Sequence, residues 1–500
     1  MYFRLSVAIL LAEVCAMAQS PGAVTPTGSL GMPRQGHAAT LNNNGEVLIT
    51  GGSSVGGPVL ASAELYSPLV GMFRPAGTMT TPRAGHTATL LPDGRILIVG
   101  GERLSGGATG ATSQASAEIY DPETQEFTKT GDMTTARSFH TATLLDSGSV
   151  LIAGGVNLDE NGKQTFLNSA DLYDPSTGRF TATGSMIAAR SFFAATLLAS
   201  GKVLISGYFN YDSPDSDVLE HAELYDPASG TFNLTGQAAY PAFALRIASS
   251  SLLTNGDVLN TLEDQCDPDV LTERYHPSTE TFDRTARTSG IRGYTTATVL
   301  PDGRVFLAGQ DFSRHESPNA SAELYDPATG QFSTPVPTGS EAGHTATLLP
   351  DGTVLLAGGW VCCGQTISSA EIYRPPVLIP APVLLTVQIP SPGGTQVVGA
   401  VLHASTHQLV SLPDNPATPG EALEVYLTGL IDGAVIRPQV IIEGHLAEVL
   451  YFGKAPGYDN LNQIDIRMPS NLAPGPHTTS LHLSYLGRSS NVVAIGVGQL

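Results

Sequence analysis

The sequence predicts an all-β protein in which a seven-bladed β-propeller precedes a smaller β-sandwich. Three observations lead to this prediction. One phrase recurs seven times at a period near 50 residues, a glycine-containing turn recurs with it, and the repeat stops before residue 377. A period of this size is typical of a propeller blade with four strands. The 54 Gly and 35 Pro residues agree with many short strands joined by tight turns.

Each repeat divides into four expected strands, a to d. Strands a and b are apolar runs on either side of a tight turn, as in HTATLLPDGRILIVGG, where Asp93-Gly94 is a strong hairpin signal. Strand c carries a tyrosine in a phrase of the type SAELYDP, and strand d carries a phenylalanine. The tyrosines are Tyr66, Tyr120, Tyr173, Tyr225, Tyr275, Tyr325 and Tyr373, and the phenylalanines are Phe73, Phe127, Phe180, Phe232, Phe282 and Phe332.

The seventh repeat lacks strand d, because the chain runs from its tyrosine into Arg374-Pro375-Pro376. The N-terminal segment supplies a replacement. Gly28 precedes Arg34 by six residues, which is the spacing found in the next three repeats, and this places Val24 at the phenylalanine position. We therefore expect the segment from Val24 to Met32 to pair with the seventh repeat and close the ring, which would also protect its open edges.

Gly-Gly doublets end strand b in four repeats and precede the tyrosine, at Gly51-Gly52, Gly100-Gly101, Gly154-Gly155 and Gly358-Gly359. With these doublets, residues 20–376 resemble the kelch family. The closest resemblance is to the central domain of secreted galactose oxidase-like proteins, which implies seven kelch blades followed by a β-sandwich. The sequence departs from the family in having Phe in place of the usual Trp, and Leu262-Glu263 where the fifth doublet is expected.

Charged and histidine residues that recur in many repeats are interpreted as structural, because a catalyst needs such a group once. We expect the arginines and carboxylates to pair within or between blades, since an unpaired buried charge is costly. We expect the histidines to be hydrogen-bonded strand residues rather than metal ligands. These sets are Arg34, Arg83, Arg137, Arg190 and Arg292; Glu64, Glu118, Asp171, Glu223, Glu273, Glu323 and Glu371; and His37, His86, His140 and His344.

The repeat ends at Pro376, and PVLIPAPVLL reads as a stiff boundary. Alternating apolar runs such as ALEVYLTGL and NQIDIRMP then predict an immunoglobulin-like β-sandwich over residues 377–500. This segment resembles a C-terminal domain of uncharacterised function found on exported proteins of soil bacteria, and that resemblance implies no reaction. The propeller accordingly spans residues 19–376.

The N-terminus indicates export. Arg4, the apolar run Leu5 to Val14 and Ala16-Met17-Ala18 form a signal peptide over residues 1–18, with cleavage near Ala18. The mature protein is therefore expected to be secreted, periplasmic or at the cell surface. A net charge of -21 argues against nucleic acid as a partner. A mean hydropathy near zero argues against a multi-span membrane protein.

The loops between strands b and c vary most, and variable loops on a rigid scaffold are where ligands usually bind. Aromatic residues in these loops are candidates to stack on a sugar or another planar face. The carboxylates are candidates to accept hydrogen bonds or hold Ca²⁺, although no EF-hand pattern is present and an acidic, solvated rim is the alternative. The ligand-binding candidates are Tyr208, Tyr211, Asp212, Asp215, Glu263, Asp267, Asp311 and Trp360.

Three cysteines follow the signal peptide, an odd number. The adjacent Cys362 and Cys363 are candidates for a vicinal disulfide, which would require a strained backbone, and unpaired loop cysteines are the alternative. No CxxC pair suggests zinc.

Two functions follow from these features. The first is an exported, non-catalytic binding scaffold whose b–c loops contact a glycan or a cell-surface protein, with no cofactor. The second, implied by the galactose oxidase resemblance, is a copper radical oxidase acting on sugars or alcohols. That chemistry needs two tyrosines and two histidines around copper, with one tyrosine cross-linked to cysteine. Tyr275-His276 resembles part of this set, but Tyr275 is an ordinary repeat tyrosine. Copper and calcium therefore have no positive support, and the binding scaffold is preferred.

Overall fold

The structure is a computed structural model with side chains. It describes the chain from residue 22 to residue 498, except residues 105–110, 208–219, 241–244, 265–270, 289–292, 312–318, 340–341, 362–364, 380, 392–393, 412–414, 432–435, 459–460 and 474. The described residues form β-strands, turns and bends, and none of them belongs to a helix long and apolar enough to cross a membrane.

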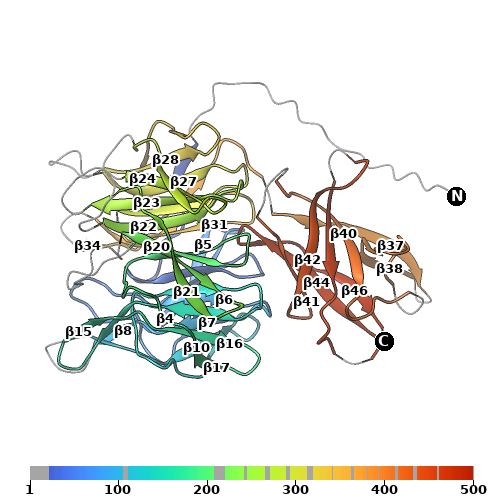
Figure 1. Cartoon of the computed structure of the whole chain (residues 1–500), viewed down its shortest axis with the longest axis horizontal. Helices are drawn as coiled ribbons and strands as arrows, with labels where there is room; N and C mark the ends of the chain where they lie inside the picture. The colour runs from blue at the N-terminus through green and yellow to red at the C-terminus, as the bar shows by residue number, and fades with distance from the viewer. Residues whose placement is uncertain are drawn as a thin grey trace.

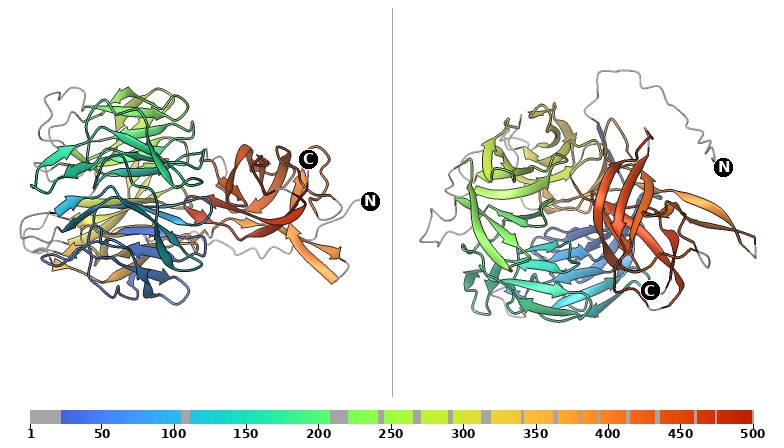
Figure 2. Two further views of the ribbon diagram at one scale, coloured as in Figure 1. Left: turned by 90° about the horizontal axis from the view of Figure 1, so that it is seen from below. Right: turned by 45° about the vertical axis from the view of Figure 1, so that its right-hand side comes forward.

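Seven antiparallel sheets form the blades of a propeller (Figures 1 and 2). The first strands of the blades contact one another in a closed ring, so they surround the central channel. The blades, in order, are β2 (Ala38–Leu41), β3 (Val47–Thr50), β4 (Ser62–Ser67), β5 (Met72–Thr78); β6 (Thr87–Leu90), β7 (Ile96–Val99), β10 (Ala117–Asp121), β11 (Glu126–Lys129); β12 (Thr141–Leu144), β13 (Val150–Ala153), β16 (Ala170–Asp174), β17 (Arg179–Ala182); β18 (Ala194–Leu197), β19 (Val203–Ser206), β20 (His221–Asp226), β21 (Thr231–Gln237); β22 (Leu245–Leu252), β23 (Val258–Asp264), β24 (Leu271–His276), β25 (Thr281–Arg284); β26 (Gly293–Val299), β27 (Val305–Asp311), β28 (Asn319–Asp326), β29 (Gln331–Phe332), β30 (Val336–Thr338); and β31 (Thr345–Leu348), β32 (Val354–Ala357), β35 (Ala370–Arg374), β1 (Ala23–Pro26).

The core lies between neighbouring blades. Strand b is buried at every residue in blades such as β3 and β7, because both faces of each sheet are covered. This explains why strand b reads as a continuous apolar run rather than an alternating one. On the outer side, the repeat tyrosine and phenylalanine face each other across strands c and d, as in Tyr66 and Phe73 with ring centroids 4.8 Å apart.

The N-terminal strand closes the ring as the sequence predicts. β1 pairs with β35, and Val24 lies opposite Tyr373, just as Phe73 lies opposite Tyr66. The strand is shorter than the expected segment from Val24 to Met32, because it ends at Pro26. Gly28 then donates its N–H to a carbonyl of the first blade, so the chain has already crossed from one blade to the next.

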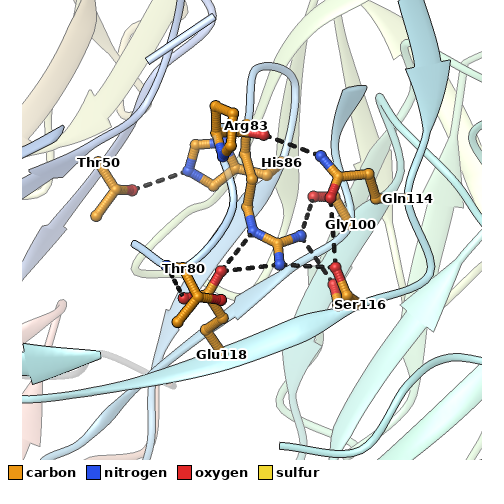
Figure 3. Close-up of polar contacts among 9 residues, drawn as sticks. Thr50, Thr80, Arg83, His86, Gly100, Gln114, Ser116 and Glu118 are labelled. Atoms are coloured by element: carbon orange, nitrogen blue, oxygen red, sulfur yellow. Dashed lines mark hydrogen bonds and ion pairs between the residues drawn. The ribbon is translucent and has the colours of Figure 1, made fainter. Parts of the chain in front are cut away.

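A buried ion pair secures the entry of the chain into a blade (Figure 3). The Arg83 guanidinium binds the Glu118 carboxylate at 3.0 Å, and neither side chain is exposed. Nη1 of Arg83 also donates to the carbonyls of Gly100 (2.7 Å) and Ser116 (2.8 Å). Glu118 in turn accepts the N–H of Thr80, which lies in the connection from the preceding blade. The equivalent pairs are Arg34–Glu64, Arg137–Asp171 and Arg190–Glu223.

The fifth blade lacks this ion pair, because Leu245 stands at the arginine position. Its carboxylate, Glu273, is buried and instead accepts hydrogen bonds from the side chain of Asn260 (3.1 Å) and the N–H of Ala239 (2.9 Å). Burial raises the pKa of Glu273, and these neutral donors offset the effect only in part. The fifth blade therefore satisfies this carboxylate with neutral donors.

The repeat histidines bridge neighbouring blades, which confirms their structural interpretation. Nε2 of each is hydrogen-bonded to a threonine hydroxyl of the preceding blade, at distances of 2.8 to 3.1 Å. The pairs are His37–Thr345, His86–Thr50, His140–Thr87 and His344–Thr296. Burial lowers the pKa of His37 and His86 to about 3 and that of His344 to about 4, so these side chains are neutral at pH 7.

The C-terminal segment forms a curled antiparallel sheet around one apolar core. Its immunoglobulin-like assignment stays a prediction. A hairpin of β37 and β38 projects from this sheet (Figure 2). The strands are β36 (Val383–Leu384), β37 (Thr386–Ser391), β38 (Gly394–Gly399), β39 (Val401–His403), β40 (Ala422–Thr428), β41 (Gln439–Ile442), β42 (His445–Lys454), β43 (Asn462–Arg467), β44 (His477–Tyr485), β45 (Arg488–Ser489) and β46 (Val493–Val497).

This C-terminal sheet lies against the a–b turns of the propeller. The Ser489 hydroxyl donates to the side-chain carbonyl of Asn43 in the first such turn, at 2.7 Å. In the fourth blade the same face contributes Leu198 to a cleft that Leu446 lines from the C-terminal side. The opposite face, which carries the b–c loops, points away from the C-terminal sheet (Figure 2). We call it the loop face.

Deleting residues 19–32 is expected to destabilise the propeller, because the deletion removes β1 and buried Leu30 and exposes the edge of β35. Removing a buried leucine side chain costs about 2–5 kcal/mol, which at about 2–4 °C per kcal/mol lowers the melting temperature by at least about 4 °C. Calorimetry measures it. A chain lacking only residues 1–18 keeps every described contact and serves as the control. An unchanged melting temperature in the longer deletion would contradict ring closure by β1.

Stability is expected to decrease as the pH falls below about 6.5, the unfolded-state pKa of histidine. Burial lowers the folded-state pKa of His140, so the unfolded chain binds the extra proton and stability rises with pH. In the variant His140→Phe, which copies Phe193 of the fourth blade, the slope between pH 4.5 and 6.5 should be shallower by about 1.4 kcal/mol per pH unit. Chemical denaturation at several pH values measures the difference, and equal slopes would show that folding does not lower the pKa of His140.

Candidate ligand site at the channel mouth

Most of the predicted ligand residues lie outside the described part of the chain. Tyr208, Tyr211, Asp212 and Asp215 fall within residues 208–219, and Asp267 falls within residues 265–270. Cys362 and Cys363 also lie outside it, so their pairing is untested. Asp311 ends β27, and its backbone pairs with Asn319 on the loop face. Glu263 and Trp360 are described in full.

Glu263 has a structural contact between two blades. It lies in β23, and its Oε1 accepts the N–H of Thr295 in β26 of the sixth blade at 2.9 Å. Four other repeats end strand b with a Gly-Gly doublet, whereas here the strand continues to Asp264. Glu263 is therefore part of the strand ladder and joins the fifth blade to the sixth.

Trp360 lies beside the mouth of the central channel. It begins the short hairpin of β33 (Trp360–Val361) and β34 (Gln365–Thr366), and its backbone exchanges two hydrogen bonds with Ala342. Its indole covers Gly343, where an added Cβ would lie 3.1 Å from ring atoms. The ring of Tyr294 approaches it edge-on, with centroids 5.2 Å apart. Tyr294 is 43% exposed, so this aromatic pair is accessible from solvent.

A second aromatic pair lies at the mouth in the third and fourth blades. The rings of Phe139 and Phe192 are stacked, with centroids 4.6 Å apart and planes 24° apart. Phe139 covers Gly85 of the second blade, where a Cβ would lie 2.8 Å from the phenyl ring. Both phenylalanines are half-buried. We call Phe139, Phe192, Tyr294 and Trp360 the mouth aromatics.

Three of the mouth aromatics occupy one repeat position, the residue immediately before the repeat histidine. Other blades place glycine there, at Gly36, Gly85 and Gly343, and all six residues have φ between 50° and 63°. A left-handed conformation costs a residue with a side chain about 1–2 kcal/mol. Strain of this kind persists only where the surroundings enforce it, and it is concentrated at functional sites.

Sequence reasoning missed Phe139, Phe192 and Tyr294, although a signal was present. Aligned repeats read RQGH, RAGH and EAGH in three blades, RSFH, RSFF and RGYT in three more, and LRIA in the fifth. An aromatic residue in a glycine position is therefore visible once the repeats are compared column by column.

A carboxylate stands in the second blade at the position of Trp360. Glu102 begins β8 (Glu102–Leu104), which forms a hairpin with β9 (Ala111–Ser113), and it bridges Ala84 as Trp360 bridges Ala342. A similar hairpin, β14 (Val156–Leu158) with β15 (Gln164–Phe166), extends the third blade on this face. Glu102 is half-buried, and burial raises the pKa of its carboxyl.

Within the described residues, no group of three or more His, Cys, Asp or Glu side chains is placed to hold a metal ion. The pair Tyr275-His276, which resembles part of the copper ligand set, makes other contacts. The Tyr275 hydroxyl is hydrogen-bonded to Thr235 at 2.8 Å, and His276 contacts Asp257 (2.9 Å) and Asp283 (3.2 Å). Both residues lie at the turn between strands c and d, on the face opposite to the mouth aromatics. They therefore do not fit a copper centre.

Comparisons with known proteins agree with the repeat architecture. A family model described as a kelch motif matches residues 82–134, which run from Pro82, just before the second blade, to Thr134 in the connection to the third. The second blade therefore carries a kelch motif. The family resemblance and the seven-bladed fold expected from the sequence are therefore confirmed.

Two further relatives are similar over different extents. Spermatocyte protein spe-26 of Caenorhabditis elegans is 27% identical over 156 residues, which is 31% of this chain and 26% of that protein. This chain thus matches only about a quarter of that relative. A solved fungal alcohol oxidase of the AA5 family, in complex with copper, superposes with a TM-score of 0.58 and 16% identity over 96% of this chain and all of that one. At that identity the likeness concerns the fold.

Proposed function

We propose that the protein is a non-catalytic binding scaffold whose loop face contacts a glycan or a cell-surface protein at the channel mouth. The mouth aromatics carry this proposal, because three of them hold a strained backbone conformation and yet remain partly exposed. Aromatic rings supply large contact areas with few rotatable bonds, and they stack on sugars and planar groups. A fully structural role would favour glycine at this position, as three other blades show.

The arrangement of the two parts supports the same proposal. The C-terminal sheet occupies the a–b turn face, so the loop face is open to a large partner. In this proposal the C-terminal domain is a spacer or an attachment module, and the signal peptide of residues 1–18 exports the protein.

The copper oxidase function is the second candidate, supported by the shared fold with the fungal alcohol oxidase. Fold likeness alone is weak support, because β-propellers host many unrelated activities. The hydrogen bonds of Tyr275 and His276 do not favour it.

A screen of glycans and extracted surface proteins is expected to identify a partner whose affinity falls about tenfold in Trp360→Ala and in Phe139→Gly. The second variant copies Gly36 and Gly85, so its melting temperature should change by only a few degrees. Leu69→Ala, at a fully exposed site in a c–d turn, is the matched control. Binding that needs only residues 377–500 would show that the loop face is not the site.

The purified protein, after incubation with copper, is expected to retain less than a stoichiometric amount and to produce no hydrogen peroxide from galactose or primary alcohols. Tyr275 and His276 are already hydrogen-bonded within the blade, so they are not free to coordinate a metal. Metal analysis and a peroxide assay test this. One copper per chain together with peroxide production that is lost in Tyr275→Phe would establish the oxidase instead.

A further inference from the structure

Gly36 leaves an open slot between the two pairs of mouth aromatics. In blade order, Gly343, Gly36 and Gly85 are consecutive around the channel, and the latter two are joined by a hydrogen bond from Gly85 N–H to the Gly36 carbonyl (2.9 Å). The indole of Trp360 covers Gly343, and the ring of Phe139 covers Gly85. Among the described residues, an added Cβ above Gly36 would meet only Gly85 N at 3.7 Å and the Ala84 Cβ at 3.9 Å. Gly36 itself is exposed.

The sides of this slot are aromatic. Trp360 and Tyr294 lie on the side of the seventh and sixth blades, and Phe139 and Phe192 lie on the side of the third and fourth blades. The faces of aromatic rings carry partial negative charge and attract cations, with Trp the most effective. Such a lining favours an apolar group that bears a diffuse positive charge.

Glu102 adds a full negative charge beside the slot. Glu102 comes directly after Gly100-Gly101, just as Trp360 comes directly after Gly358-Gly359. Each of the two residues forms a backbone β-bridge to the residue that precedes the left-handed glycine of its own blade. The Trp360 ring reaches from the seventh blade to Tyr294 of the preceding blade. From the same register we infer that the Glu102 side chain leaves the second blade on the side of the first blade, where Gly36 lies. Its partial burial strengthens attraction to a cation, because water screens the charge less.

We propose that this slot binds an organic ammonium group, with the mouth aromatics around its alkyl substituents and Glu102 paired with its charge. The inference rests on the proposed function, since it names the chemistry of the group that the loop face recognises. A free alkylammonium, an amino sugar or a lysine side chain would each present this group. The net charge of -21 would also attract cations to the protein over long range.

Trp360 is the only tryptophan in the chain, so its fluorescence reports on this site alone. Titration with choline is expected to change the emission saturably. The neutral isostere 3,3-dimethylbutan-1-ol should bind at least about fivefold more weakly, since it lacks the charge. Glu102→Gln should weaken choline binding by a similar factor, whereas Glu123→Gln, the same change in an exposed turn on the opposite face, should leave it unaltered.

Gly36→Phe is expected to abolish the fluorescence response by filling the slot. Phe139 and Phe192 already hold phenylalanine in the same backbone conformation, so the variant should fold, and its melting temperature checks this. If Gly36→Phe fails to fold, the Glu102→Gln comparison decides the question by itself. Equal affinity for choline and its neutral isostere, or unchanged choline binding in Glu102→Gln, would overturn the inference.

The two proposals fail separately. A partner from the screen that binds through Trp360, combined with no response to choline, amino sugars or lysine, would leave the binding scaffold in place and reject the ammonium group. Choline binding that survives Trp360→Ala, measured by calorimetry, would show that the cation binds elsewhere and would also reject it.

Discussion

The buried arginine–carboxylate pair at the start of a blade is the interaction on which the propeller and its channel mouth both depend. In the second blade, the guanidinium of Arg83 joins the chain entering strand a to the end of strand b and to Glu118 in strand c. The residue two positions later, Gly85, is the one with the left-handed conformation. The same offset relates Arg137 to Phe139 and Arg190 to Phe192. An anchor this close explains how a phenylalanine is held in a conformation it would otherwise avoid.

Two blades lack the arginine, because Leu245 stands at that position in the fifth blade and Glu341 in the seventh. The seventh blade still has a left-handed glycine, Gly343, whereas the fifth blade does not keep this geometry. Leu245 replaces the arginine, and β22 begins at that residue and runs for eight residues, twice the length of β2 or β6. Ile247, at the position of the mouth aromatics, pairs with Leu262 inside the ladder and has no left-handed conformation. At the fifth blade, the channel mouth is therefore bordered by a strand residue instead of a residue in the left-handed conformation. A buried pair of charges is costly to desolvate, so its value in the first four blades lies in fixing one geometry rather than in large net stability.

The repeat made the propeller predictable, because a column that recurs seven times averages out local exceptions. The histidines, the Arg–carboxylate pairs and the closure by Val24 opposite Tyr373 all follow from spacing alone. The site was harder to predict, because it is built from exceptions to the repeat. The prediction favoured residues in the long loops. Of these, Tyr211 and Asp267 lie outside the described chain, and the carboxylate of Glu263 accepts an N–H of the next blade. A left-handed φ at Phe139 is a backbone property that hydrophobic pattern does not encode.

In the C-terminal sheet, the alternation of apolar and polar residues located strands such as β40 and β43, but their pairing depends on contacts that are distant in sequence.

Ring closure by β1 also sets an order of events during synthesis and folding. Val24 leaves the ribosome early, but its partner Tyr373 follows about 350 positions later. Until the seventh repeat is available, the first six blades would form an open arc with an uncovered apolar sheet face at each end, and the entropy of joining such distant segments must be overcome in one late step. A chain interrupted before residue 370 would thus expose two apolar sheet faces, so the vulnerable interval for aggregation or proteolysis lasts for most of the time needed to make the propeller.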